Sequence, residues 1–181
     1  MVMSIADIDS WNPEAIRSVG AAGNARAAAA GEAGSRLRSL RAFGTWRGGG
    51  ADAARTRTET IADQLQRHGR AAATVAAAAN AAADEVRAIK AQLAQLRTAL
   101  GRHGIIIRAD GTVVPPPNLA SLAPARQRLI ASLLTAGQLS VDRIRLAAEL
   151  TDARLADALN PAGGDEFDPP QSVHRPAGHS G

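Results

Sequence analysis

The sequence contains a glycine-rich stretch, Phe43-Gly44-Thr45-Trp46-Arg47-Gly48-Gly49-Gly50, between two long alanine-rich segments. Alanine is the best helix former among the amino acids, whereas runs of glycine interrupt helices. The arrangement therefore predicts a helical hairpin, with two long helices that fold back on one another at this turn.

The segment after the turn, 51–100, carries apolar positions in alternating steps of four and three residues. These positions are Ile61, Leu65, His68, Ala72, Val75, Ala79, Ala82, Val86, Ile89, Leu93, Leu96 and Leu100. The spacing is close to the 3.5-residue period of a packed helical seam. A stripe of this length predicts a long helix that needs a partner surface.

A first helix is predicted to begin at Pro13, because Asn12 is a good N-cap and proline suits the first helical position. It should run to about Phe43. Its inward stripe has the same spacing and consists mostly of small residues: Ile16, Gly20, Gly23, Ala27, Ala30, Gly34 and Leu37. Each glycine costs ~1 kcal/mol in a helix, so three on one stripe indicate close approach of a neighbouring backbone. The alternative is a compositional bias toward Gly and Ala.

The two predicted helices differ in length. At ~1.5 Å per residue the first spans ~46 Å and the second ~75 Å, which leaves an overhang of roughly 30 Å. The bulky residues of the stripe lie in this overhang, and each stabilises the fold by about 1.5–3 kcal/mol if it is buried. We therefore expect another segment or another protein to cover residues 86–100.

Residues 105–114 predict a short β-hairpin, because β-branched residues flank an Asp110-Gly111 turn. A further helical pattern covers 123–160, where Gly137 predicts a kink and Ser140 is a candidate cap that would split the segment into two helices. This segment can fold back along the overhang. Residues 161–181 are rich in Gly, Pro, Asp, His and Ser without apolar periodicity, which favours a disordered tail.

The predicted fold is thus all-α: an elongated antiparallel hairpin (1–104), a short β-hairpin with a Pro-rich linker (105–122), a C-terminal helical segment (123–160) and the tail (161–181). Many of the inward-facing residues are alanine or glycine, which are small, so the hydrophobic core should be thin.

Composition limits the function. The chain has no cysteine, so disulfides and thiolate metal sites are excluded. Among its 21 Lys and Arg residues only Lys90 is lysine, yet the net charge is +4 and the charges are mixed along both helices. With no tyrosine and few other aromatic residues, specific nucleic-acid binding is disfavoured. The most apolar stretch, 71–83, is far shorter than the ~20 residues of a membrane span, and the N-terminus does not resemble a signal peptide.

No residue set predicts catalysis, a cofactor site or a metal site. Gly178-His179-Ser180-Gly181 resembles part of a nucleophile elbow, but the strand and helix that this motif requires are missing. The tail contains five acidic or histidine side chains without fixed spacing, so a metal cluster is disfavoured; they are Asp165, Glu166, Asp168, His174 and His179. His68 lies on the predicted seam and is interpreted as a structural histidine.

Trp46-Arg47-Gly48 at the joint of the two helices resembles the Trp-x-Gly helical-hairpin superfamily of type VII (ESX) secretion substrates. Three longer stretches, 11–17, 40–46 and 82–90, are similar to the N-terminal hairpin found ahead of α/β-hydrolase-type or toxin domains in actinobacterial proteins. The Asp110-Gly111 turn and Leu155-Ala156-Asp157-Ala158-Leu159 are similar too. The resemblance covers roughly residues 5–160.

This resemblance implies a non-catalytic secretion-associated substrate, adaptor or chaperone-like partner that forms helical-bundle complexes. Its partners would be another helical-hairpin protein, as a hetero- or homodimer, or the secretion ATPase. Trp46 would anchor the partner, Gly48 would permit the chain reversal, and the packing residues would be Ile61, Leu65 and Val75.

Two other functions remain open. In the first, the chain is the targeting half of a split effector and binds a separately encoded hydrolase or toxin through the Leu-rich stretch from Val86 to Leu100, which includes Ile89, Leu93 and Leu96. In the second, it is an Arg-rich binder of nucleic acid or membrane surfaces. The resemblance implies a cytoplasmic protein before export, then a secreted or envelope-associated one. Family members carry a Tyr-x-x-x-acidic export signal beyond the second helix, and this chain contains no tyrosine.

Overall fold

A computed structural model describes residues 3–40 and 45–160 of the chain. In this part the secondary structure is almost entirely helical, which confirms the predicted all-α class. The elements are α1 (Ile5–Ser10), α2 (Pro13–Arg38), α4 (Gly49–Gly101), β1 (Ile106–Ile107), β2 (Val113–Val114), the 3-10 turn η1 (Leu119–Ser121) and α5 (Pro124–Leu159). The predicted disordered tail lies outside the described residues.

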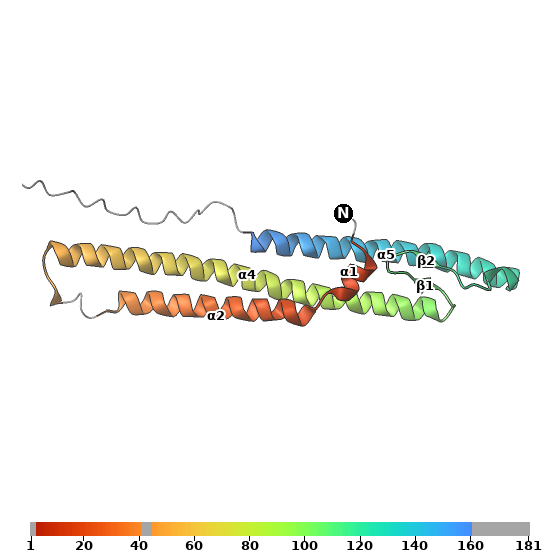
Figure 1. The fold of residues 1–181 in the computed structure, drawn as a ribbon, viewed down its shortest axis with the longest axis horizontal. Coiled ribbons are helices and arrows are strands. Elements are labelled where there is room, and N and C mark those ends of the chain that lie inside the picture. Colours follow the sequence, from red (N-terminus) through yellow and green to blue (C-terminus); the bar gives the residue numbers. More distant parts are fainter. Residues whose placement is uncertain (1–2, 41–44, 161–181) are drawn as a thin grey trace, which may run out of the picture.

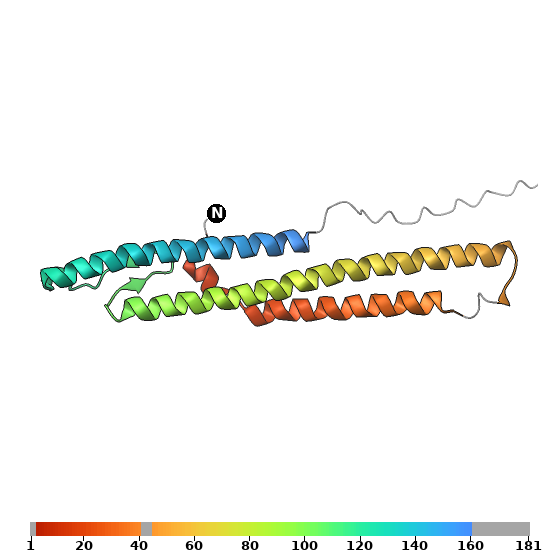
Figure 2. The same cartoon turned by 180° about the vertical axis from the view of Figure 1, so that it is seen from behind.

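The longest helix, α4, forms the spine of an elongated molecule (Figure 1). Helix α2 runs antiparallel to α4 and packs along its N-terminal half and onward to Asp84, which pairs with Arg17 of α2. The C-terminal half packs against α5, also antiparallel, and the short helix α1 crosses α4 beyond the start of α2, within the region that α5 covers (Figure 2). The structure thus contains the predicted hairpin and the predicted fold-back of the C-terminal helix onto the overhang.

Helix α2 begins as predicted and ends earlier than predicted. The Asn12 side chain accepts hydrogen bonds from the backbone N–H groups of Glu14 and Ala15, and Pro13 is the first helical residue. The helix ends at Arg38 instead of near Phe43. At its end the Ser39 hydroxyl donates to the carbonyl of Arg36, a local bond of the kind that competes with helix propagation.

Small residues bring α2 and α4 close together. A Cβ atom added at Gly23 would lie 3.0 Å from the Ala76 Cβ, and one added at Gly69 would lie 3.3 Å from the carbonyl oxygen of Ala27. Both distances are shorter than ordinary van der Waals contact between carbon or oxygen atoms. The glycines of this seam therefore permit the close approach that the sequence predicted.

One half of the predicted stripe on α4 faces a different side than expected. Ala62, Gly69 and Ala76 are buried against α2, while Ile61 and His68, each one residue earlier, are exposed. The predicted stripe is buried only farther along, where Val86, Ile89 and Leu93 are covered. The reason is that α4 uses two neighbouring stripes, one for α2 and one for α5.

The β-hairpin forms as predicted, with Ile106 paired to Val114 and Ile107 to Val113. Gly111 at the turn has a φ of +92°, which favours glycine, and the Asp110 Oδ1 accepts from the Thr112 N–H at 2.8 Å. This bond lowers the pKa of Asp110. The hairpin packs on α5, because the Gln138 side chain accepts from the Val113 N–H and donates to the Gly111 carbonyl.

Helix α5 is continuous from Pro124 to Leu159, so of the two possibilities left open by the sequence, one helix or two, the structure has one. The Ser140 hydroxyl donates to the Ala136 carbonyl within the helix instead of capping a new one. Gly137 is buried, and a Cβ added there would lie 3.0 Å from the Leu100 Cδ1. The glycine thus accommodates the packing of α4 against α5.

The main hydrophobic core lies where α1, α4 and α5 meet. It contains Ile5, Ile8, Ile89, Leu93, Val141, Ile144 and Ala148. A second cluster, formed by Leu100, Ile105 and Ile130, lies at the far end beside the β-hairpin. The bulky core is therefore confined to the C-terminal half of the spine.

Candidate partner-binding surface

The turn between the two long helices presents an exposed tryptophan. Trp46 is 51 % exposed, and its carbonyl accepts a hydrogen bond from the Arg55 Nη2 at 2.7 Å. Gly48, two residues later, has a φ of +102°, a conformation that residues with a side chain rarely adopt. The chain therefore enters α4 through a glycine-dependent bend, with an indole ring that is open to a partner.

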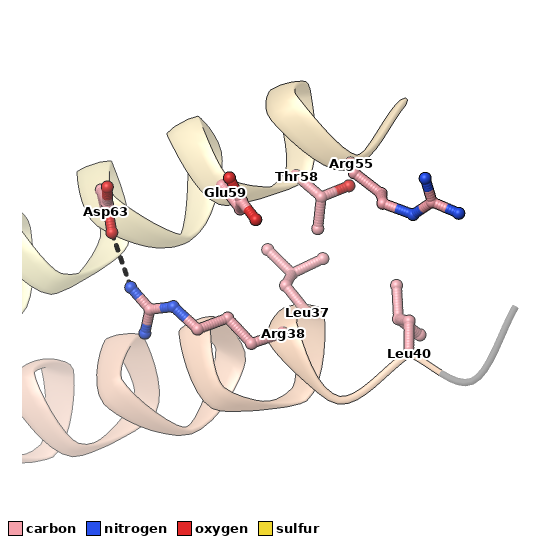
Figure 3. A pocket seen from close by; sticks show the side chains of 7 residues that line it. All are labelled: Leu37, Arg38, Leu40, Arg55, Thr58, Glu59 and Asp63. Atoms are coloured by element: carbon pink, nitrogen blue, oxygen red, sulfur yellow. Dashed lines mark hydrogen bonds and ion pairs between the residues drawn. The ribbon is translucent and has the colours of Figure 1, made fainter. Parts of the chain in front are cut away.

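A cavity of about 450 Å³ lies beside this turn, between the end of α2 and the start of α4. Figure 3 shows Leu37 and Leu40 extending from the α2 side toward α4. Charged groups surround them, among them the ion pair of Arg38 with Asp63 at 2.6 Å. The cavity thus combines two leucines with charged groups of both signs.

A longer groove of about 930 Å³ runs along α2 and α4, and we call it the α2/α4 groove. Its lining consists of Val19, Ala22, Gly23, Arg26, Ala29, Ala30, Ala33, Leu65, His68, Ala71, Ala72 and Val75. Arg26 and His68 are its only titratable residues, so the groove is apolar with basic groups and no carboxylate. Such a surface suits the apolar face of another helix.

The structure separates the predicted binding residues into two groups. Leu65 and Val75 line the α2/α4 groove, and Ile61 is 38 % exposed on α4. Residues of the second group, Val86, Ile89 and Leu93, are at most 5 % exposed, and Ile89 and Leu93 lie in the core that α1 and α5 of the same chain form with α4. A separate effector would not reach these three residues.

Leu96, the last predicted binding residue, is half-buried. It lines a shallow cavity of about 410 Å³ between α4 and α5, together with Ser140, Arg143 and Ile144. This cavity is the part of the predicted Val86–Leu96 surface that α5 leaves partly open.

Helix α5 carries an apolar stripe on its outer face that was not among the predicted binding residues. Leu139, Leu146 and Leu150 are 55 %, 57 % and 52 % exposed. Their spacing of seven and four residues was a signal for one helix face. Helix α5 thus has leucines on two faces, since Leu133 and Leu134 pack against the second hydrophobic cluster.

Ion pairs hold the elements around the groove and the core. Asp9 in α1 accepts two hydrogen bonds from Arg97 in α4, at 2.9 and 2.7 Å, and the hydrogen bond from Arg97 lowers the pKa of Asp9. Arg87 pairs with Glu14 at 2.5 Å, and Glu85 pairs with Arg154 at 2.9 Å. Several arginines therefore serve to join helices of this chain.

Within the described ranges, no group of three or more His, Asp or Glu side chains is placed to hold a metal ion. Ser180 and the acidic and histidine residues of the tail lie outside these ranges. Among the described helices, none combines the length and the hydropathy that crossing a bilayer requires.

A family model described as "Uncharacterised protein Rv0964c" matches residues 41–178, which is more than half of the chain. The chain belongs to this family. The matched range contains the Trp46 turn, α4, the β-hairpin and α5, whereas α1 and α2 precede it. No solved structure matches the chain. The spine, the Trp46 turn and the α5 leucines are thus features within the family region.

Proposed function

We propose that this protein is a non-catalytic partner subunit of type VII secretion, a substrate, adaptor or chaperone-like protein that forms helical-bundle complexes. Its partner is another helical-hairpin protein, and the secretion ATPase is a further candidate. In this proposal the protein is made in the cytoplasm and leaves the cell, or reaches the envelope, through that system. The proposal starts from the Trp-x-Gly sequence and is supported by the surface around it.

The observation that carries the proposal is the position of Trp46. A tryptophan that closed the hairpin as a core residue would be buried, whereas this one is half-exposed beside the Gly48 bend. Exposed aromatic residues next to apolar grooves are typical anchors of protein interfaces, since tryptophan is enriched among residues that dominate binding energy.

The energetics of the α2–α4 seam support a partner. Its buried positions are mostly alanine and glycine, and one buried methyl group contributes about 0.8 kcal/mol. Fixing the backbone of each residue costs about 1–2 kcal/mol. A hairpin with this seam gains from burying its open face against further helices.

The test is co-expression of the full chain with a small helical-hairpin protein encoded beside it, followed by purification through a tag on that protein. We expect a stoichiometric complex, which Trp46→Ala weakens by about tenfold or more. Ile106→Ala is the matched control, because Ile106 is 57 % exposed on β1, away from the turn. The control should bind like the wild type.

An export assay gives an independent measure. In cells that carry the secretion system, the chain should reach the culture filtrate or the envelope fraction only when the paired hairpin protein is present, because the chain lacks a tyrosine-based signal. Equal export from cells without the secretion system would contradict the proposal, as would failure to co-purify together with retention of the chain inside the cell.

A further inference from the structure

The edge of the α2/α4 groove continues the face of α4 that α5 covers. His68, Val75, Ala82 and Ile89 are seven residues apart, so they share one side of the helix. Ile89 is buried in the core with residues of α5, whereas His68 and Val75 line the open groove. A segment that continued past the end of α5 along this side of α4 would therefore meet the groove.

Helix α5 ends just before the groove begins. The Thr151 hydroxyl donates to the Glu85 carboxylate at 2.6 Å, which sets the register of the two antiparallel helices. With the same rise per residue in both helices, Leu159 at the end of α5 is about level with Ala77 of α4. Val75 follows about 3 Å farther along the spine. Figure 1 shows the same relation, with α5 covering only one half of α4.

Two basic side chains lie on this stretch of the groove. A Cβ added at Gly69 would lie 3.3 Å from the Ala27 carbonyl oxygen, so Ala27 and its neighbour Arg26 are about level with Gly69 and His68. Arg26 and His68 are exposed, and neither forms an ion pair with the described residues. Both basic groups are therefore available to an acidic ligand.

Nearby carboxylates do not neutralise these basic groups. Asp63 pairs with Arg38 at 2.6 Å and Asp84 pairs with Arg17, and neither acidic residue lines the groove. The smaller cavity beside the turn differs, because carboxylates are part of its lining. The α2/α4 groove is thus an apolar surface whose charged groups have one sign.

The chain carries the complementary groups shortly after α5. The sequence Asp165-Glu166-Phe167-Asp168 places three carboxylates beside one of the two phenylalanines of the chain. These four residues lie outside the described part of the chain. An aromatic ring among acidic groups complements an apolar groove with basic groups, in charge as well as in hydrophobicity.

The tether from α5 to this acidic sequence is long enough to reach the groove. An extended chain spans about 3.3 Å per residue, so residues 165–168 reach roughly 17–26 Å from Asn160. His68 is about 14 Å along the spine from the end of α5 and one interhelical distance of about 8–10 Å across it, hence roughly 17 Å away. Arg26 is one helix farther across, at most roughly 23 Å away. Leu96 and its cavity lie about 28 Å in the opposite direction, beyond this reach.

We propose that the sequence Asp165-Glu166-Phe167-Asp168 binds in the α2/α4 groove of the same chain. The Phe167 ring contacts the alanines of the groove, and the carboxylates lie beside Arg26 and His68. A short tether gives an effective concentration of the order of 1 mM. A contact with a dissociation constant of about 0.1 mM then keeps the groove about nine-tenths occupied. The inference goes beyond the proposed function, because it holds for the isolated chain.

Docking of the acidic sequence affects access to the groove. Leu65 and Val75 line it and are also predicted partner-binding residues. A partner helix must therefore displace the acidic sequence before it binds there. This competition rests on the proposed function, whereas the docking itself does not.

The first experiment locates the acidic sequence in the full chain by NMR. Because the chain has no cysteine, Ser172→Cys accepts a single nitroxide spin label just beyond residue 168. The amide signals of Leu65, Ala72 and Val75 should broaden, whereas that of Leu139 on the outer face of α5 should not. A mixture of spin-labelled chain and ¹⁵N-labelled chain without the nitroxide should show no broadening, since the contact is within one chain.

The second experiment removes the contacting groups from the spin-labelled chain. Phe167→Ala should lower the ratio of docked to undocked chains roughly tenfold, because the buried ring is lost. The double variant Arg26→Gln, His68→Gln should lower it about two- to tenfold, because two exposed charge contacts are lost. Arg70→Gln is the matched control, since Arg70 is an exposed arginine of α4 that does not line the groove, and it should leave the ratio unchanged.

Four results would overturn the inference. They are an unbroadened groove, broadening on another surface such as the outer face of α5, equal broadening in the mixture, and broadening that neither Phe167→Ala nor the double variant reduces. Equal broadening in the mixture would make a second copy of the chain the source of the bound segment. Circular dichroism of each variant shows that its helices are intact.

The proposed function fails separately. Phe167→Ala should raise the affinity for a co-expressed helical-hairpin protein by up to about tenfold, because the competing segment is released. Unchanged affinity would contradict the competition for the groove. A chain whose groove signals broaden as expected, but which binds no hairpin protein with or without Phe167→Ala, contradicts only the proposed function.

Discussion

The two halves of α4 meet their neighbours through different chemistry. The N-terminal half contacts α2 through Ala62, Gly69 and Ala76, and one side of this pair remains an open groove. The C-terminal half is covered by α1, the β-hairpin and α5, with Ile89 and Leu93 in a bulky core. One long helix thus joins a C-terminal half that other elements of the same chain cover to an N-terminal half that leaves an apolar groove uncovered.

This difference between the halves explains how a thin helical rod can have a bulky core in one half and an uncovered apolar groove in the other. Burial of large side chains provides most of the stabilisation per residue, and these residues are concentrated in the C-terminal half. That half holds α4 in a fixed position, so the first half can present small residues and a groove. Stability and recognition are therefore assigned to different stretches of one helix.

The largest expected effect is in the C-terminal core. Leu93→Ala should lower the free energy of unfolding by about 2–5 kcal/mol, because Leu93 is 1 % exposed and its removal leaves a cavity. Leu146→Ala, the same change on the outer face of α5, should cost within about 0.5 kcal/mol. Urea denaturation followed by circular dichroism measures both. Equal losses would contradict the assignment of Leu93 to the core.

The next effect tests the closeness of the α2–α4 seam. Gly23→Leu should lower the free energy of unfolding by about 1–3 kcal/mol, because the new side chain would overlap Ala76 and the Ala72 carbonyl. Gly31→Leu on the same helix meets no atom within 4 Å at its Cβ and should stabilise by somewhat less than 1 kcal/mol. Thermal unfolding of the two variants should show shifts of opposite sign.

How far the sequence predicts this molecule depends on whether the relevant contact is local. The start of α2 follows from Asn12 and Pro13, and the β-turn follows from Asp110 and Gly111, because these residues determine their own backbone. The side of α4 that faces α2 depends on the neighbouring helix. In an alanine-rich segment two adjacent stripes look alike, so Ile61 and His68 were assigned to the wrong one.

The candidate surface was predictable only where it depends on local sequence. Trp46 and Gly48 indicate the turn because of their residue types, and the predicted residues Leu65 and Val75 do line the groove. Sequence predicted a cover for Val86, Ile89 and Leu93 but left open whether α5 or a partner provides it. The leucines on the outer face of α5 were missed, because a helix with leucines on two faces has no single apolar stripe to indicate which side is free.

A smaller effect concerns the ion pair that fastens α1 to the spine. Asp9→Asn should reduce the free energy of unfolding by about 0.2–1 kcal/mol at pH 7, since the pair with Arg97 is partly exposed. The pKa of Asp9 is lowered in the folded state, so its contribution is full above the unfolded pKa of about 3.9 and declines as pH falls through the folded pKa.

The difference between wild type and Asp9→Asn should therefore shrink as the pH falls through the lowered pKa of Asp9, and it should also shrink at high salt. Urea titrations at several pH values measure it. Ser10→Ala is a neighbouring control, because the Ser10 hydroxyl bonds only to the carbonyl of Asp7 within α1. A difference that persists unchanged at low pH would exclude the ionised Asp9 as its source.

The smallest effect tests whether α5 is one continuous helix, because α5 covers the C-terminal half of α4. Because the Ser140 hydroxyl bonds to the Ala136 carbonyl of its own helix, Ser140→Ala should change the free energy of unfolding by less than about 0.5 kcal/mol. If Ser140 instead capped a second helix, the same change would cost about 1 kcal/mol.

Hydrogen exchange at residues 136–142 separates the two cases directly, since amides of an unbroken buried helix exchange slowly and those of a break exchange fast. Protection that continues through Gly137 would show that one rigid helix supports both the core on its inner face and the leucines on its outer face.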